Sequence, residues 1–161
     1  MTTEPQKPSD HGAALGAVVS KLADAGYALR PDLPERCATC AFKPGVMPNQ
    51  MASTLLDAYR CVLGIDTDAF ACHHGMTEGQ PTKLCGGYLA ALAAPWTVVK
   101  AATEELKIKL DDISANPGRR DEVREAYDAW VAVADPEGRL NAYQLAREHL
   151  KTLKTSVPEP A

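Results

Sequence analysis

The segments RCATCAFKPG, residues 36–45, and FACHHGMTEGQPTKLCGG, residues 70–87, decide how this chain folds. Both are rich in turn-forming and polar residues, so burial of their few apolar side chains is not expected to order them. Cys37 and Cys40 have the two-residue spacing at which two thiolates can bind one metal ion. The sequence therefore predicts that a bound ion organises both segments.

The predicted metal ligands are four cysteines that lie outside the predicted helices: Cys37, Cys40, Cys72 and Cys85. Four thiolates suit either a tetrahedral zinc ion or a [4Fe-4S] cluster. The single C-x2-C pair leaves room for a cluster, whereas the nearby histidines suit zinc. Zinc is therefore the predicted cofactor, and [4Fe-4S] is the alternative.

Other cysteine and histidine side chains have less direct roles. His73 and His74 follow Cys72 directly, and a residue next to a ligand usually points away from the ion. We expect one of them either to replace a thiolate or to donate a hydrogen bond to a ligand sulfur. Cys61 falls within a predicted helix, where a packed apolar role is favoured over ligation. His149 is predicted to be exposed on a charged helix flank.

Apolar residues at helical spacing predict a mainly α fold. A helix over residues 13–25 is expected to end at Gly26, and a second helix runs from a capping Asn49 to Leu63. Three further helices follow Pro95. They cover residues 96–113, residues 119–134, and a segment capped by Asp135 and begun by Pro136.

The chain divides into four predicted parts. Residues 1–12 and 155–161 are expected to be disordered tails, 13–95 a small irregular metal-binding module, and 96–154 a three-helix antiparallel unit. Thr103 interrupts the apolar seam of the first helix in that unit, and such a polar position often sets partner choice. The seam side chains expected to be buried are Trp96, Leu106, Leu110, Trp130, Leu140 and Leu150.

Composition limits the classes of partner. The formal net charge of -4 over 161 residues does not indicate a phosphate-binding face for nucleic acid. Neither a membrane-spanning run of ~20 apolar residues nor a signal peptide is present in the sequence, so a cytoplasmic protein is predicted. In a reducing compartment, cysteines crowded between positions 37 and 85 are better explained as metal ligands than as disulfides.

Three functions compete at this level. The favoured hypothesis is a non-enzymatic, metal-stabilised module that contacts a protein partner, or a second copy of itself, through residues 96–154. The alternative is an iron–sulfur redox sensor. A zinc hydrolase that uses Glu78 as acid and base is least favoured, because the H-x-E and P-C-x-x-C deaminase signature is absent.

The motifs CATCAFKPG, FACHH and CGGYLAAL resemble a family of small cysteine-rich proteins from actinobacteria and their phages. That family carries C-x2-C with an aromatic and a basic residue, then F-x-C-H, then C-x-G-aromatic. The resemblance covers about residues 36–92 and implies a metal-binding module without implying a reaction. Its pattern positions here are Cys37, Cys40, Phe42, Lys43, Cys72, His73, Cys85 and Tyr88. Ala41 replaces a common proline and Gly86 a common alanine, which leaves each proposed ligand in place.

Overall fold

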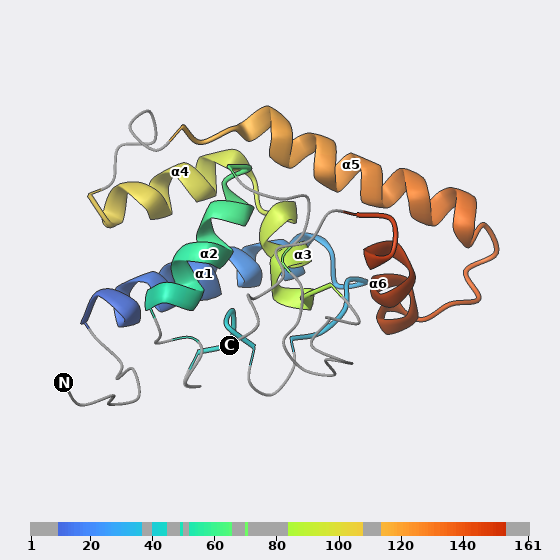
Figure 1. Ribbon diagram of the computed structural model, residues 1–161, viewed down its shortest axis with the longest axis horizontal. Helices are drawn as coiled ribbons and strands as arrows, with labels where there is room; N and C mark the ends of the chain where they lie inside the picture. The colour runs from blue at the N-terminus through green and yellow to red at the C-terminus, as the bar shows by residue number, and fades with distance from the viewer. Residues whose placement is uncertain are drawn as a thin grey trace.

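The computed structural model describes residues 10–36, 40–44, 49, 52–65, 70, 84–107 and 114–153. Within these residues the helices are α1 (Asp10–Leu29), α2 (Ala52–Val62), α3 (Gly86–Ala93), α4 (Trp96–Glu105), α5 (Pro117–Ala134) and α6 (Ala142–Leu150). The prediction of a mainly α fold is confirmed (Figure 1). Of the helices in the described part of the chain, none has the length and apolar character needed to cross a membrane.

Helix α3 lies at the centre of the molecule and is buried on every side (Figure 1). All eight of its residues, from Gly86 to Ala93, are buried. A helix that is apolar all round has no polar face, so it carries none of the periodicity that reveals a surface helix. For this reason the sequence did not predict α3, although every other described helix had a predicted counterpart.

Helix α1 packs against α3 with its backbone in direct contact. It begins at Asp10 and continues through Gly26 to Leu29, so the prediction that Gly26 ends this helix is wrong. A Cβ atom at Gly26 would lie 1.6 Å from the carbonyl oxygen of Ala90 in α3. Gly26 therefore serves the close approach of two helices and not the end of one.

Asn49 does not cap α2, so that prediction is also wrong. The helix begins at Ala52, and Asn49 is a buried residue in a 3-10 turn before it. The side-chain amide nitrogen lies within hydrogen-bond distance of three acceptors: Gly16 O at 3.1 Å, Ser20 Oγ at 3.0 Å and Ala41 O at 2.7 Å. Because these acceptors belong to α1 and to the turn that follows Cys40, Asn49 fastens that turn to α1.

One cluster of buried apolar side chains joins all the described helices. It includes Leu22 of α1, Val62 of α2, Val99 of α4, Tyr127 of α5 and Leu150 of α6, together with α3. The cluster extends across Pro95, which is the N-cap of α4. The division into units 13–95 and 96–154 stays a prediction about which parts fold independently.

Helix α4 is shorter than predicted and directs its polar seam position inward. It ends at Glu105, and Lys107 has a φ of 59°, in the left-handed region where an α-helix cannot continue. Thr103 is fully buried, where its hydroxyl donates to Val99 O at 2.8 Å and shares a hydrogen bond with the Tyr59 hydroxyl of α2. The polar seam position is thus satisfied inside the protein.

The predicted seam side chains differ in burial. Leu150 is buried, whereas four others are partly buried, and Leu110 lies outside the described residues. The three helices also pack on different neighbours: α4 on α1, α5 on α3, and α6 on α5. The partly buried seam residues are Trp96, Leu106, Trp130 and Leu140.

A buried arginine anchors α5 to the core. Arg120 is 1% exposed, and its Nε donates to Val62 O at 2.7 Å while Nη2 donates to Ala91 O at 3.0 Å and Ala94 O at 3.2 Å. These carbonyls lie at the C-terminal ends of α2 and α3, where backbone oxygens carry partial negative charge. Burial lowers the pKa of Arg120 to about 10, so the group stays charged at neutral pH.

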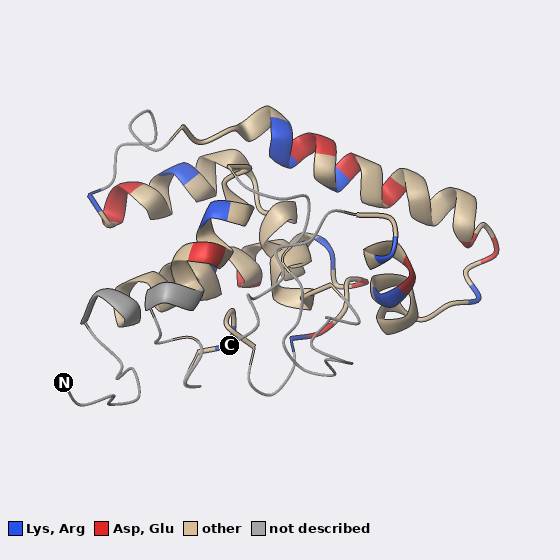
Figure 2. Ribbon diagram, viewed as in Figure 1, with Lys and Arg blue, Asp and Glu red and all other residues tan. Residues whose placement is uncertain are grey.

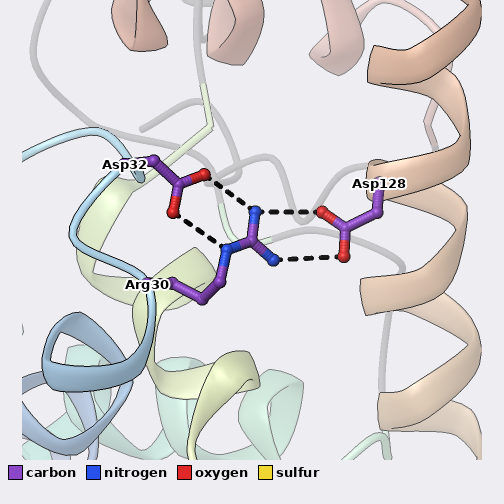
Figure 3. A network of polar contacts seen from close by, with 3 residues as sticks. All are labelled: Arg30, Asp32 and Asp128. Carbon is purple, nitrogen blue, oxygen red and sulfur yellow. Dashed lines mark hydrogen bonds and ion pairs between the residues drawn. The ribbon is translucent and has the colours of Figure 1, made fainter.

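A second arginine ties α5 to the end of α1. Arg30 donates two hydrogen bonds of 2.9 Å to Asp32 and two of 3.1 Å to Asp128 of α5, so its guanidinium lies between two carboxylates (Figure 3). The hydrogen bonds from Arg30 lower the pKa of Asp32. This contact lies near the surface, unlike that of Arg120.

Charges of both signs alternate along α5 (Figure 2). Arg119 pairs with Glu122 at 3.9 Å and Arg124 with Asp121 at 3.3 Å, each three residues apart on the same helix. Because the pairs neutralise each other locally, α5 does not present a continuous basic stripe of the kind that tracks a phosphate backbone.

Helix α6 begins later than predicted. Asn141 is its N-cap and forms a capping box with Gln144, so the first helical residue is Ala142. Asp135 is instead the C-cap of α5, and its carboxylate accepts two backbone amides of the following loop at 2.8 and 2.9 Å. The prediction that Asp135 caps the last helix is wrong because its side chain closes that loop.

His149 is buried, so the prediction that it is exposed is wrong. Only 3% of the residue is accessible, and its ring packs against Tyr127 and Trp130 of α5, with centroids 5.1 and 4.9 Å apart. Burial lowers the pKa of the imidazole. The helix flank that carries His149 is therefore the face that docks on α5.

Candidate metal centre

Two of the four predicted ligands meet in the described part of the chain. The Sγ atoms of Cys40 and Cys85 are 3.5 Å apart, although 45 positions separate them in sequence. Both residues are buried, at 4% and 3% exposure. Cys37, Cys72, His73 and His74 lie outside the described residues, and within those described no group of three or more metal-binding side chains occurs.

The CGG sequence at the start of α3 explains how Cys85 comes so close to Cys40. Cys85 is the extended N-cap of α3. A Cβ atom at Gly86 would lie 2.4 Å from Pro34 O, and one at Gly87 would lie 2.4 Å from Cβ of Phe42. Only residues without side chains let the helix start touch both the segment before Cys37 and the turn after Cys40.

The turn that carries Cys40 is held by three hydrogen bonds. The Lys43 amide donates to Cys40 O at 2.9 Å and closes the turn. Asn49 donates to Ala41 O at 2.7 Å, and Nη1 of Arg36 donates to Phe42 O at 2.8 Å. The sulfur position is therefore fixed by α1 and by the residues before and after the turn.

The surroundings of Cys40 favour its thiolate. The hydrogen bond shared with Cys85 lowers the pKa of Cys40 most strongly, and burial opposes this effect. The backbone amides of Phe42 and Gly87 also donate to the sulfur, and the positive charge of Arg36 acts in the same direction. Amides at a helix N-terminus and a nearby cation are the usual means of stabilising a thiolate.

Aromatic rings line the site beside the sulfurs. Phe70 packs edge-on against Phe42, with centroids 6.0 Å apart at 71°, and lies 6.5 Å from the ring of Tyr88. The carbonyl oxygen of Phe70 accepts the Cys85 amide at 3.0 Å. This bond places Phe70 directly beside Cys85.

Helix α6 reaches the same place through the backbone. The amide of Leu84, the residue before Cys85, donates to the carbonyl oxygen of Ala146 in α6 at 3.2 Å. The Cys85 segment is therefore bonded on one side to Phe70 and on the other to α6. Sequence patterns gave no indication of this contact, because a backbone hydrogen bond does not depend on side-chain type.

Tyr27 and Arg36 also belong to the site, and sequence analysis did not select them. The Tyr27 hydroxyl donates to Pro34 O at 2.6 Å, and the Arg36 guanidinium lies 5.3 Å from the Tyr27 ring centroid and 2.8 Å from a carboxylate oxygen of Asp24. Burial raises the pKa of Tyr27, and the charges of Cys85 and Cys40 raise it further. The one sequence feature that could have placed Arg36 at the site is its position as a cation directly before Cys37.

A cleft of about 470 Å³ opens next to Tyr27 and Arg36. Tyr27, which interacts electrostatically with both cysteines, is one of its walls. The other lining residues are Asp24, Pro31, Leu33, Glu35, Arg36 and Lys43. Lys43, which closes the turn that carries Cys40, is part of this lining, so the cleft reaches that turn.

Cys61 occupies a different environment. It lies near the end of α2 and is 1% exposed. A small side chain packed within a helix at this depth matches the predicted apolar role. Its exclusion from the ligand set stays a prediction.

The distance between the two sulfurs fits a mononuclear ion. Zinc–sulfur bonds of about 2.3 Å in a tetrahedron place neighbouring sulfurs about 3.8 Å apart. The observed 3.5 Å is close to that value. In a [4Fe-4S] cluster each thiolate binds a different iron atom, which requires a wider separation. The described half of the predicted ligand set thus suits one shared ion.

No family model matches this chain, and comparisons with curated proteins and with solved structures find no match. The resemblance to the actinobacterial and phage family therefore stays a prediction that rests on the motifs alone.

Proposed function

We propose that this protein is a non-enzymatic zinc-binding module, with Cys37, Cys40, Cys72 and Cys85 as ligands. The observation that carries the proposal is the 3.5 Å separation of the Cys40 and Cys85 sulfurs, which come from distant segments and are surrounded by amide donors. Two thiols that lie this close together can both bind one metal ion. When bound, zinc supplies a cross-link between otherwise separate turns.

Covalent geometry supports the two remaining ligands. Cys72 follows Phe70 by two residues, which span at most about 7 Å of chain. The carbonyl of Phe70 is itself bonded to the Cys85 amide. Cys37 directly follows Arg36, whose guanidinium bonds Phe42 O beside the Cys40 turn. Cys37 is thus one residue, and Cys72 two residues, from a residue that borders the sulfur pair.

Four thiolate ligands support a structural site over a catalytic one. A catalytic zinc ion keeps a position open for water or substrate, whereas a tetrahedral four-cysteine set fills every position. Metal binding then contributes directly to folding free energy, which suits segments that contain few apolar residues. The cytoplasmic location predicted from the sequence is part of this proposal.

The metal content of the protein tests the proposal. We expect protein purified without oxygen to contain one zinc ion per chain, measured by mass spectrometry of the metal. Cys85→Ser should lose most of this zinc and melt at a lower temperature, because a serine hydroxyl is a poor ligand for zinc. Cys61→Ser is the matched control and should retain the metal.

Two results would contradict this assignment. Equal zinc loss in Cys61→Ser and Cys85→Ser would show that the loss reflects damage to the fold and not to a ligand. Iron and sulfide in place of zinc, with broad absorbance near ~400 nm, would replace the zinc site by the [4Fe-4S] alternative.

The regulatory or interaction role is proposed for the 96–154 helices. Its support is the exposure of Val133 on α5 and Tyr143 on α6, at 84% and 48%. Light scattering over a range of concentrations tests self-association, with Val133→Glu as the disrupting variant and Ala132→Glu as the neighbouring exposed control. A monomer at every concentration would exclude the homodimer and leave only a different protein as partner.

A further inference from the structure

The cysteine pair also identifies a site of oxidation. The C-x2-C spacing of Cys37 and Cys40, read above as metal-binding, is also the spacing of redox-active disulfides. The sulfur closest to Cys40 in the described part of the chain is instead that of Cys85, at 3.5 Å. We propose that hydroperoxides oxidise Cys40 and Cys85 to a disulfide with each other, in preference to the Cys37–Cys40 pair.

Little movement is needed to form this bond. A disulfide bond is about 2.05 Å long, so the sulfurs, which are 3.5 Å apart, must approach by about 1.5 Å. The segments on either side are already packed together, because Gly86 lies against the carbonyl oxygen of Pro34 and Gly87 against the side chain of Phe42. The fold therefore holds both thiols in place before the oxidant arrives.

The oxidant approaches through the cleft that borders the Cys40 turn. Both thiols are almost fully buried, which excludes large reagents. The recess of about 470 Å³ has Tyr27 as a wall, and Tyr27 also interacts with both cysteines. A small oxidant such as hydrogen peroxide fits this approach, whereas Cys61 is packed within α2.

The chemistry balances with one peroxide molecule. One thiolate attacks a peroxide oxygen, the O–O bond breaks, and the products are a sulfenic acid and hydroxide. The second thiolate then attacks the sulfenic sulfur, the S–S bond forms, and a second hydroxide leaves. Two protons convert the hydroxides to water. The two thiols lose two electrons in total, and peroxide gains them.

This inference does not require a bound metal, since it depends only on the two sulfurs. Where zinc is bound as proposed, the disulfide removes two of four ligands, so oxidation releases the ion. The bond would also close a loop between the Cys40 turn and the start of α3, leaving the two segments joined after the metal has gone.

Peptide mapping distinguishes the possible disulfide pairings, because trypsin places Cys40 and Cys85 on different peptides. Cleavage after Arg36, Arg60, Lys83 and Lys100 gives peptides 37–60, 61–83 and 84–100, and the Lys43–Pro44 bond resists. Cys37 and Cys40 share the first peptide, Cys61 and Cys72 the second, and Cys85 is alone in the third. The full-length protein is treated with hydrogen peroxide, alkylated and digested without reduction.

We expect peptide 84–100 to be joined to 37–60, and fragmentation of the joined pair to place the bond at Cys40. The same cross-link should persist in Cys37→Ser and vanish in Cys40→Ser. An alkylated linear 84–100 with a bond inside 37–60, or a link between 84–100 and 61–83, would overturn the pairing. So would a peroxide-treated protein in which all five cysteines remain alkylatable.

Metal analysis before oxidation separates this inference from the proposed function. A protein that contains no zinc but forms the cross-link supports the disulfide and refutes the zinc site. The opposite result is a protein that binds zinc but gives no cross-link with peroxide, either before or after a chelator has removed the zinc. That result supports the zinc site and refutes the disulfide.

Discussion

Helices α3 and α5 are attached to the same core in different ways. In α3 all eight residues are buried, and its contacts are spread along the whole helix. In α5, which has 18 residues, only Arg120 and Tyr127 are buried. Attachment of α3 therefore depends on close backbone packing, and attachment of α5 on a few polar anchors. This difference predicts that the two helices respond to different kinds of substitution.

The largest effect is expected where α1 touches α3. Gly26→Val would force a side chain into the carbonyl of Ala90, which already lies 1.6 Å from an ideal Cβ position. Because both partners are helix backbone, neither can yield, and we expect a loss of more than about 4 kcal/mol in the free energy of unfolding, or no folded protein. Circular dichroism and urea unfolding measure this.

Gly118→Ala is the matched control for a glycine in α5. A Cβ atom there would contact only Asn116 Oδ1, at 3.6 Å. We expect a change within about 1 kcal/mol, because alanine favours the helix. Equal destabilisation by Gly26→Val and Gly118→Ala would refute the distinction between the two helices.

Arg120→Met should give the next largest effect. It removes the donor for Val62 O and for Ala94 O after α3, and buried acceptors without partners cost about 1–3 kcal/mol each, whereas Ala91 O keeps the Ala94 amide as donor. We expect a loss of about 3 kcal/mol in urea unfolding, with faster amide exchange in α5 than in α1. Arg124→Met, at a partly exposed position whose ion pair with Asp121 lies at the surface, should change stability by less than about 1 kcal/mol.

The pH dependence tests the α5–α6 contact. Burial lowers the folded-state pKa of His149 below 6.5, so the unfolded chain binds a proton more readily. Stability from this group is therefore complete above pH 6.5 and is lost as pH falls below it. His149→Phe keeps the packing on Tyr127 and Trp130 without the titration. Its melting temperature should fall less than that of the wild type between pH 7.5 and 5.5.

The smallest effect is expected at the surface. Asp128→Asn weakens the bridge to Arg30, whose partner Asp128 is half exposed, so the loss should be below about 1 kcal/mol and should shrink in high salt. A loss above about 2 kcal/mol that is insensitive to salt would mean that this bridge, and not Arg120, is the main anchor of α5.

The sequence predicted the helices that have one apolar face. Helix α2 and helix α5 were placed within a few residues, because their apolar positions recur at helical spacing. It missed α3, which lacks a polar face, and misplaced Asn49 and Asp135, whose side chains bond distant or following backbone groups instead of a helix start. Local patterns do not encode such non-local partners.

Cys40 and Cys85 illustrate the same limit at the candidate site. Their residue type and neighbouring glycines made them candidates, yet their mutual distance depends on Phe42, Pro34 and the backbone of α3. No spacing rule connects residues that are 45 positions apart. Sequence could therefore nominate these two thiols but could not show that they face each other.

The Arg120 contact has a consequence for synthesis on the ribosome. Ala94, whose carbonyl accepts from Arg120, precedes it by 26 residues. At about 5–20 residues per second, Ala94 therefore emerges from the ribosome about 1–5 s before Arg120 does. During that interval the carbonyls at the ends of α2 and α3 are bonded to water, so these helix ends cannot yet be buried in the core. The nascent chain should therefore acquire protease resistance at the length that frees Arg120, and not when α3 is first complete.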